Sequence, residues 1–171
     1  GYMVREGKPT GFFYLDHRTV DGVHALITDI HLTPANLHDS VPYLDRLDRM
    51  RNRFGFDVAA VGLDAGYFTP AICKGLEERD VYGVIAYRRP THREGYFYKR
   101  EFIYDRVRDA YLCPAGEFLC YRTTNRLGYR EYASSTGQCI HCLMRSQCTQ
   151  SAAAIKVVTR HVWEDFKEAV A

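Results

Sequence analysis

The sequence predicts an α/β fold, in which a mixed sheet with flanking helices is interrupted by an irregular, cysteine-rich insertion. In the first half of the chain, short apolar runs typical of strands alternate with segments whose apolar residues recur at helical spacing. This order breaks down after Tyr87, where turn-forming residues become frequent. Five of the six cysteines also lie beyond Tyr87, which sets the second half apart.

The first elements are expected to form a β-hairpin. Residues 12–20 are rich in aromatic and β-branched residues and predict a strand, and residues 24–32 predict its partner. Asp21-Gly22 between them is a strong turn signal. Histidines recur here every seven residues, but an odd interval along a strand places side chains on opposite faces. We therefore do not expect the four to converge on one site (His17, His24, His31 and His38).

The chain then alternates between helices and strands. Asp39 or Ser40 is expected to cap an amphipathic helix that has Pro42 in its first turn. Three further elements follow: a strand over 58–63, a helix from 70 to about 79 and a strand over 81–86. The order hairpin, helix, strand, helix, strand predicts a mixed sheet with helices on its faces.

Asp64 is the most informative residue, because it ends the predicted strand over 58–63. Gly66 allows a sharp turn after it, and Thr69-Pro70 opens the next helix as cap and first-turn residue. A carboxylate at the end of a strand lies at the rim of a sheet, where metal ions and phosphates can reach it. The alternative is that Asp64 only caps the turn.

Length and composition indicate a globular protein. A chain of 171 residues is long enough for one domain with a real core, alone or with an appendage. Its 46% hydrophobic and 26% charged residues are an ordinary globular mixture. There is no apolar run of membrane-spanning length and no signal-peptide pattern, so we expect a soluble, intracellular protein. Because the first residue is Gly1 and not Met, we interpret the chain as a segment of a longer protein.

The net charge of +2 is unevenly distributed. Residues 87–108 carry seven Lys or Arg against three Asp or Glu, and they mix these basic residues with tyrosine and phenylalanine. That mixture suits phosphate pairing together with contacts to bases or sugars. A solvated polar loop is the alternative. The candidate DNA contacts are Arg88, Arg89, His92, Arg93, Lys99 and Arg100.

Three domains are expected from these patterns. Residues 1–87 form the sheet-and-helix core, and residues 88–150 form the irregular insertion. Residues 151–171 begin a return to the core, since apolar residues at helical spacing predict a helix over 159–170.

The cysteines of the insertion suggest a structural metal site. Cys139 and Cys142 form a CxxC knuckle, Cys148 comes after five intervening residues, and Cys113 precedes a tight turn. Four thiolates from these residues would hold Zn²⁺ tetrahedrally and stabilise a segment with little core of its own. His141 or Cys120 could replace one ligand. Disulfides and unliganded thiols are the alternatives.

At this point the chain resembles a known family. The stretch Leu32-Thr-Pro-Ala-Asn-Leu-His-Asp-Ser40 followed by Leu63-Asp-Ala-Gly-Tyr67 is similar to the second-aspartate region of bacterial insertion-sequence transposases of the DDE type. The tail, with Cys113-Pro-Ala-Gly116 and Cys139-x-x-Cys142-x5-Cys148, resembles the branch with a cysteine-containing insertion after that aspartate. The resemblance covers nearly the whole chain.

The resemblance implies a ribonuclease H-like fold that holds two divalent ions, normally Mg²⁺, between three carboxylates. It implies DNA cleavage and strand transfer on double-stranded DNA by a homo-oligomer. Asp64 matches the second aspartate. The first aspartate is expected to precede Gly1, and the glutamate to follow the insertion, since Glu164 and Glu168 lack the family's surrounding pattern. We therefore expect this segment alone to be inactive. The alternatives are a non-catalytic, zinc-stabilised DNA-binding module and an inactive remnant of a transposase.

Overall fold

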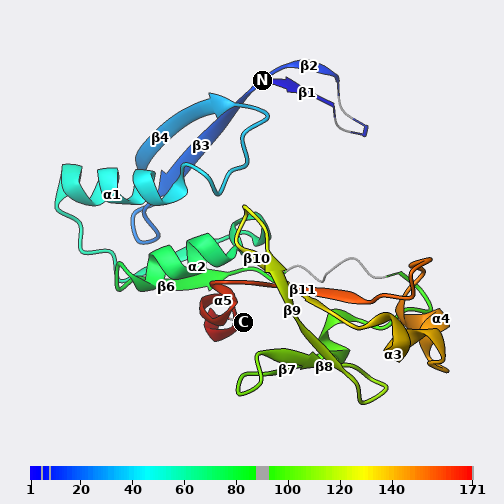
Figure 1. The fold of residues 1–171 in the computed structure, drawn as a ribbon. Coiled ribbons are helices and arrows are strands. Elements are labelled where there is room, and N and C mark those ends of the chain that lie inside the picture. Colours follow the sequence, from blue (N-terminus) through cyan, green and yellow to red (C-terminus); the bar gives the residue numbers. More distant parts are fainter. Residues whose placement is uncertain (5, 8, 88–92, 171) are drawn as a thin grey trace. The chain divides into compact units, whose positions relative to one another are not determined.

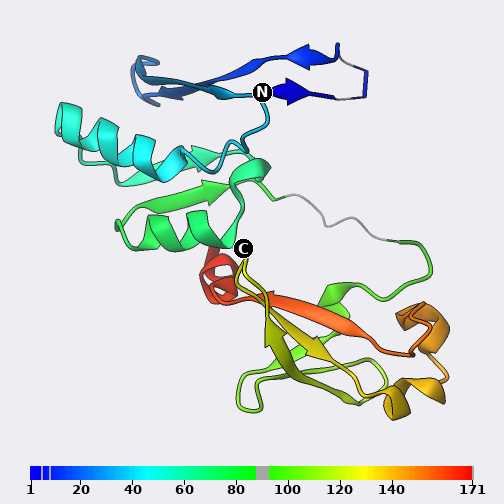
Figure 2. The ribbon, with the colours of Figure 1, turned by 45° about the horizontal axis from the view of Figure 1, so that its top comes forward.

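The computed structural model describes residues 1–4, 6–7, 9–87 and 93–170, and the chain divides into two compact units (Figures 1 and 2). Unit 1 comprises residues 1–88 and 166–171, and unit 2 comprises residues 89–165. Each unit has its own hydrophobic core. Among the described residues, none of the helices has the length and apolar character that crossing a bilayer requires.

Unit 1 holds four short β-strands and a helix, followed by a β–α–β arrangement. Its elements are β1 (Tyr2–Met3), β2 (Gly11–Phe12), β3 (Tyr14–Val20), β4 (Ile27–Pro34), α1 (Tyr43–Phe54), β5 (Ala60–Leu63), the 3₁₀ turn η1 (Ala65–Tyr67), α2 (Pro70–Glu77) and β6 (Tyr82–Ile85). The C-terminal helix α5 (Glu164–Val170) places its residues from 166 onward in this unit.

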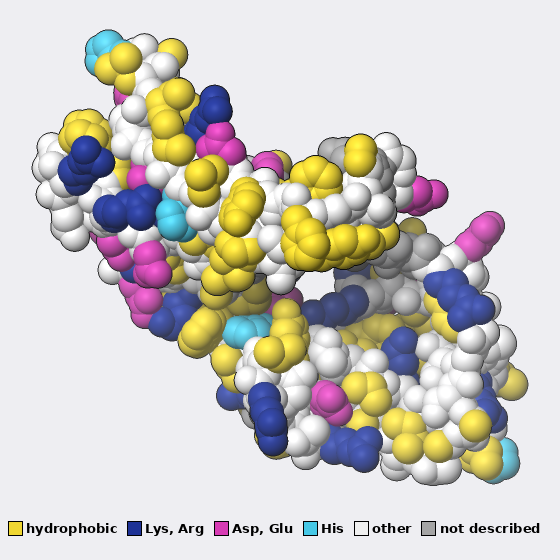
Figure 3. Space-filling model, turned by 90° about the horizontal axis from the view of Figure 1, so that it is seen from above, with side chains coloured by type: hydrophobic (Ala, Val, Ile, Leu, Met, Phe, Trp, Pro, Cys, Tyr) yellow, Lys and Arg dark blue, Asp and Glu magenta, His cyan; other side chains and the backbone are white. Residues whose placement is uncertain are grey.

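The predicted hairpin is present as β3 and β4, which pair antiparallel with Tyr14 opposite Pro34. The turn predicted at Asp21-Gly22 is confirmed, but the connection is longer than expected: it runs over residues 21–26, and the second strand begins at Ile27 and not at His24. The Asp21 carboxylate closes this loop by accepting a hydrogen bond from the His24 backbone N–H at 2.6 Å. One face of this two-stranded sheet stays exposed and is partly apolar. Exposed hydrophobic side chains on this face include Tyr14, Ile30 and Leu32. Figure 3 shows hydrophobic side chains interspersed with charged ones on the surface.

Helices α1 and α2 cover the core of unit 1. The predicted start of α2 is confirmed, since the Thr69 hydroxyl accepts from the Ile72 N–H at 3.3 Å and Pro70 follows the cap. The predicted cap of α1 is wrong: the helix begins at Tyr43, and no side chain caps it. The buried residues of this core are Tyr43, Leu47, Met50, Ile72, Leu76 and Val81.

The strands of unit 1 form separate two-stranded sheets and not the single mixed sheet that the sequence predicts. β5 and β6 pair in parallel, with Leu63 opposite Ile85, while β3 pairs with β4. Within the described part of the chain, no strand joins the β3–β4 pair to the β5–β6 pair. The α/β class is therefore confirmed, whereas the continuous ribonuclease H-like sheet is not formed by these residues.

Unit 2 is an antiparallel sheet of five strands, in the order β11-β10-β9-β8-β7. The predicted irregular insertion is therefore wrong. Its sequence misleads because the strands are short and separated by tight turns, while much of the core consists of aromatic residues. Its elements are η2 (Lys99–Glu101), β7 (Ile103–Asp105), β8 (Ala110–Leu112), β9 (Phe118–Thr124), β10 (Tyr129–Ala133), α3 (Thr136–Ile140), α4 (Arg145–Cys148) and β11 (Val157–His161).

The core of unit 2 is centred on Tyr132, which is fully buried. The Tyr132 and Tyr104 hydroxyls both donate to Oδ1 of Asp109 at 2.6 Å. These hydrogen bonds lower the pKa of the Asp109 carboxyl. The predicted helix over 159–170 starts later than expected, because β11 pairs residues up to His161 with β10 and α5 begins at Glu164.

Candidate functional site

A groove of about 1140 Å³ runs through unit 1 along β3 and β5. It is lined by every residue of 15–22 and every residue of 58–64, but by none of β6. Successive side chains of a strand point to opposite faces, so a groove that touches all of them follows the strand's edge. The groove therefore lies along the open edges of β3 and β5. Its remaining wall comes mainly from α1, with Tyr43, Arg46, Leu47 and Met50.

Asp64 lies on this groove, directly after the last residue of β5, and its side chain is exposed. Its Oδ1 accepts a hydrogen bond from the Gly66 N–H at 2.7 Å and so caps the turn η1. Capping the turn and binding a metal ion or phosphate, the two roles considered for Asp64 from the sequence, are thus compatible. A carboxylate can accept several hydrogen bonds or metal contacts, so one bond to Gly66 fixes its orientation and leaves acceptor capacity toward the groove.

A second carboxylate, Asp39, lines the same groove. The pKa of the Tyr67 phenol is raised, first by burial and further by the negative charges of Asp39 and Asp64. Burial likewise raises the pKa of Tyr43, to about 12, and its ring packs edge-on against Tyr67 with centroids 5.1 Å apart. From the sequence, Asp39 is expected to cap a helix. The signal that could have placed it here was its position in the His-Asp-Ser stretch, beyond the end of β4.

The hairpin is attached to α1 beside the groove by a buried ion pair. Nε of Arg46 donates to Oδ2 of Asp29 at 2.8 Å, and the two side chains are 4% and 10% exposed. Arg49 donates to the other oxygen of Asp29 at 2.5 Å, but its side chain is half-exposed. Burial alone would raise the pKa of Asp29, yet the guanidinium groups of Arg49 and Arg46 outweigh it and lower that pKa. Sequence reasoning found none of these three residues.

The oxygen donors at this groove suit a hard cation such as Mg²⁺, which proteins bind through one or two carboxylates together with substrate phosphates. Asp64 and Asp39 supply such donors. Over residues 1–4, 6–7, 9–87 and 93–170, however, no three His, Cys, Asp or Glu side chains are grouped to hold a metal ion. The described residues thus supply only part of the ligands that a metal site needs.

Comparison with known protein families shows that residues 13–161 match the transposase DDE domain. This chain belongs to the transposase DDE domain family. The match covers most of the 171 residues, including the hairpin, Asp64 and unit 2. No curated protein and no solved structure was found to match the chain. Family membership places it among DNA-binding proteins that carry out transposition, and the family generally uses Mg²⁺ or Mn²⁺.

Three of the candidate DNA contacts of this transposase domain lie on the surface of unit 2. Arg93 stacks on Tyr96 at 4.7 Å and donates to Gln150 at 2.7 Å. Arg100 stacks on Tyr98 at 4.6 Å, and Lys99 pairs with Glu164 at 3.2 Å. The other three candidates, Arg88, Arg89 and His92, lie outside the described residues.

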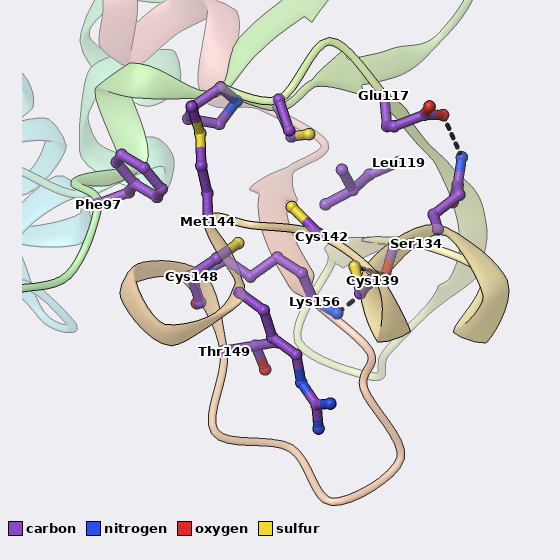
Figure 4. Close-up of a pocket in the computed structure, with 15 residues that line it drawn as sticks. Phe97, Glu117, Leu119, Ser134, Cys139, Cys142, Met144, Cys148, Thr149 and Lys156 are labelled. Carbon is purple, nitrogen blue, oxygen red and sulfur yellow. Dashed lines mark hydrogen bonds between the residues drawn. The ribbon is translucent and has the colours of Figure 1, made fainter.

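The four predicted zinc ligands line one small cavity of about 20 Å³ in unit 2 (Figure 4). These are Cys113, Cys139, Cys142 and Cys148. In Figure 4, Cys142 and Cys148 lie around the cavity and Cys139 lies beside Ser134, to whose Oγ the Cys139 thiol donates at 3.1 Å. Burial raises the pKa of the Cys148 thiol; Lys156 opposes this effect and the other three thiols add to it. The side chains as placed do not form a metal cage among the described residues.

The two substitute ligands considered from the sequence do not join this cavity. Cys120 lies on β9 and is exposed, and His141 is exposed at the end of α3. The sixth cysteine, Cys73, is buried in α2 of unit 1. The structure thus brings together the four thiols that the spacing had grouped and leaves out the other candidates.

Proposed function

We propose that this chain is part of a DNA transposase that cleaves and joins phosphodiester bonds at insertion-sequence ends in a metal-dependent reaction. Asp64 is assigned as the second carboxylate of the DDE triad. The observation that carries the proposal is the exposed position of Asp64 at the carboxyl end of a parallel strand, on an open groove, within the range that matches the family. A bound Mg²⁺ would neutralise charge on the attacking oxygen of water or a DNA 3′-hydroxyl and on the oxygen that leaves the phosphate.

In this role the Gly66 N–H would hold the Asp64 carboxylate in place before any metal binds. A hydrogen bond of 2.7 Å to one oxygen restricts rotation of the side chain. The second oxygen would then be available as a metal ligand. Asp39 on the same groove would add negative charge that favours a cation there.

The groove also supports completion of the site by a further strand. β3 pairs only with β4 and β5 only with β6 in the described residues, so each strand presents one open edge to the groove. An extended segment between them would satisfy both edges and join the pairs into one mixed sheet. The family resemblance implies that a strand preceding residue 1 carries the first aspartate. We propose that this strand occupies the groove and brings its carboxylate toward Asp64.

For DNA contact we propose the exposed cations of unit 2 together with the predicted residues 88, 89 and 92. Arg93 and Arg100 lie over tyrosine rings, an arrangement that can present a guanidinium to a phosphate and a ring to a base or sugar. Each phosphate that the protein neutralises makes the slope of log affinity against log salt concentration steeper by about 1, so losing one such contact makes it shallower by about 1. Arg100→Ala in the complete transposase should therefore weaken DNA binding and flatten its salt dependence by about that amount.

The decisive experiment is strand transfer by the complete protein in Mg²⁺, with Asp64→Asn compared with Asp57→Asn. Asp57 is an exposed aspartate on the same groove, before β5, and is a matched control. Loss of a metal ligand should remove about 3 kcal/mol or more of transition-state stabilisation, which is about a hundredfold in rate. Asp57→Asn should retain activity, and both variants should bind transposon-end DNA like the wild type.

A second outcome would favour a non-catalytic, zinc-stabilised DNA-binding module or an inactive remnant. If the complete wild-type protein binds insertion-sequence ends but shows no cleavage in Mg²⁺ or Mn²⁺, the catalytic proposal is wrong for this gene. If Asp64→Asn transfers strands as fast as the wild type, the assignment of Asp64 is wrong. The proposal also expects a homo-oligomer on DNA, which sedimentation of the protein–DNA complex can measure.

A further inference from the structure

Three separate segments of unit 2 supply the four thiols of this cavity, and Gln138 of α3 also donates hydrogen bonds to Glu117 and to the Phe118 carbonyl. Cys113 comes directly after β8, Cys139 lies in α3 with Cys142 just beyond it, and Cys148 ends α4. No residue of α3 or α4 is buried, so these one-turn helices contribute little to the hydrophobic core. The thiols nevertheless line a common cavity.

The apolar side chains of this region are arranged opposite to what hydrophobic packing would produce. Leu143 is fully exposed and Ile140 is half-exposed, while the neighbouring Cys139 and Cys142 turn toward the cavity. Burying a leucine or isoleucine side chain is worth about 1.5–3 kcal/mol, so packing alone would favour the reverse orientation. An interaction of the sulfur atoms inside the cavity would offset the exposed apolar surface.

The cavity also carries positive charge. Lys156 and Arg145 line it, and Nζ of Lys156 donates to the backbone carbonyl of Cys148 at 2.9 Å. Both cations also have other partners, since Lys156 lies over the Phe102 ring and Arg145 donates to the Ser151 carbonyl, and the lining includes the acidic Glu117. Beside four thiolates around a divalent ion, a site with a net charge of −2, the two cations would be favourable.

We propose that Cys113, Cys139, Cys142 and Cys148 bind one Zn²⁺ ion as four thiolates, and that this ion anchors α3, α4 and the turn after β8 to the sheet of unit 2. Four soft sulfur ligands in tetrahedral arrangement are typical of structural zinc sites. The cavity of about 20 Å³ is close to the space of a single water-sized particle, which suits one ion and excludes a larger cluster. Binding replaces four S–H bonds with four Zn–S bonds and releases four protons to the solvent.

The contacts of Cys139 indicate what would change on binding. The Cys139 thiol now donates to the Ser134 hydroxyl, which also accepts the backbone N–H of Lys156 at 3.0 Å. Once Cys139 is deprotonated, that donation is lost and the side chain is free to turn toward the other three sulfurs. Ser134 is buried, so its hydroxyl can then donate to the thiolate and orient it.

The test is the zinc content of the purified chain, reconstituted with Zn²⁺ under reducing conditions and then desalted. We expect about one zinc per chain in the wild type and in Cys120→Ser, whose thiol lies outside the cavity. Cys142→Ser and Cys148→Ser should each lose more than about half of it. X-ray absorption should give four sulfur neighbours at about 2.3 Å.

Because a cysteine variant can lose zinc by unfolding, a second measurement uses the wild type alone. Titration with Co²⁺ should produce the intense visible bands of tetrahedral thiolate coordination, and Zn²⁺ should displace them. Wild-type protein that binds less than about half an equivalent of zinc, or that shows a Cys139–Cys142 disulfide and no cobalt spectrum after reduction, would overturn the proposal. Equal zinc loss in Cys120→Ser would overturn the ligand set. None of these readouts uses DNA transfer, so failure here leaves Asp64 untouched.

Discussion

The buried pair between Arg46 and Asp29 attaches the β3–β4 hairpin to α1, and its removal gives a sharp test of the architecture around the groove. The change is Arg46→Met, which keeps an unbranched side chain of similar reach and removes the charge. It deletes the 2.8 Å bond to Asp29 and a second one to the Thr19 hydroxyl at 3.1 Å. Asp29 is then left as a nearly buried carboxylate with Arg49 as its remaining arginine partner.

The expected cost follows from the burial of the two arginines. Breaking a buried ion pair by removing one partner costs about 3–5 kcal/mol. Arg49 still neutralises Asp29 after the change, so we expect a cost somewhat below that range, about 2–3 kcal/mol. Arg49→Met is the matched control because it removes the half-exposed partner of the same carboxylate. Exposed pairs contribute about 0.2–1 kcal/mol, so the control should cost less than about 1 kcal/mol.

The assay is urea unfolding of the whole chain followed by far-UV circular dichroism, with amide exchange of β3 and β4 as the local readout. The free energy of unfolding should also depend on pH. Asp29 has a lowered pKa when folded, so its pairing stabilises the protein above the pKa of an unfolded aspartate, about 3.9. That stabilisation disappears as the pH falls through the folded pKa. The difference between wild type and Arg46→Met should therefore narrow in acid.

Two results would refute this reasoning. If Arg46→Met lowers the free energy of unfolding no more than Arg49→Met at neutral pH, the burial of Arg46 does not make its interaction with Asp29 the stronger one. If the difference between wild type and Arg46→Met is constant from neutral pH down to about pH 3, the interaction is not the charge pair with Asp29. Faster exchange throughout the chain, instead of mainly in β3 and β4, would show that the pair supports the whole unit and not the hairpin attachment.

Three further changes test the two cores and the cap at the candidate site. Tyr132→Phe removes a buried hydroxyl from a charged acceptor, Asp109, and should lower the free energy of unfolding by about 1.5–3 kcal/mol in urea titrations; a change below about 0.5 kcal/mol would contradict this. Leu76→Ala creates a cavity beneath α2 and should cost about 2–5 kcal/mol, whereas Leu127→Ala on the exposed turn should be nearly neutral. In thermal unfolding, Asp64→Ala should lower the free energy of unfolding by about 1 kcal/mol because the cap is lost, whereas Asp64→Asn should change it very little. Equal losses in the two variants would show that the cap is not the cause.

Local chemistry explains why several features could be predicted from the sequence. Thr69-Pro70 is a cap and first-turn pair whose geometry depends on neighbouring residues alone, and α2 begins where it predicts. Asp64 follows an apolar run and precedes Gly66, so its place after a strand and at a turn also depends on short-range backbone preferences. The α1 helix was found from its apolar spacing, although its cap was placed too early.

The errors share a different cause, which is contact between residues distant in sequence. Residues 159–161 are expected to begin a helix, but pairing with β10 makes them part of a strand. Tyr104, Tyr111 and Tyr132 sit among polar and turn-forming residues, and only their mutual packing turns a seemingly irregular insertion into a unit with a core. Strand pairing over such separations leaves little trace in any local window.

The sequence by itself therefore determined the α/β character, the carboxylate at the end of a strand and the grouping of four cysteines by spacing. These follow from periodicity, turn chemistry and ligand type, which are properties of neighbouring residues. Only the tertiary structure decided that Asp39 shares a groove with Asp64, that Arg46 is buried against Asp29, and that Cys120 and His141 lie apart from the other thiols. Such relations depend on how strands pair and helices pack, because burial and proximity are set by contacts across the fold and not by order along the chain.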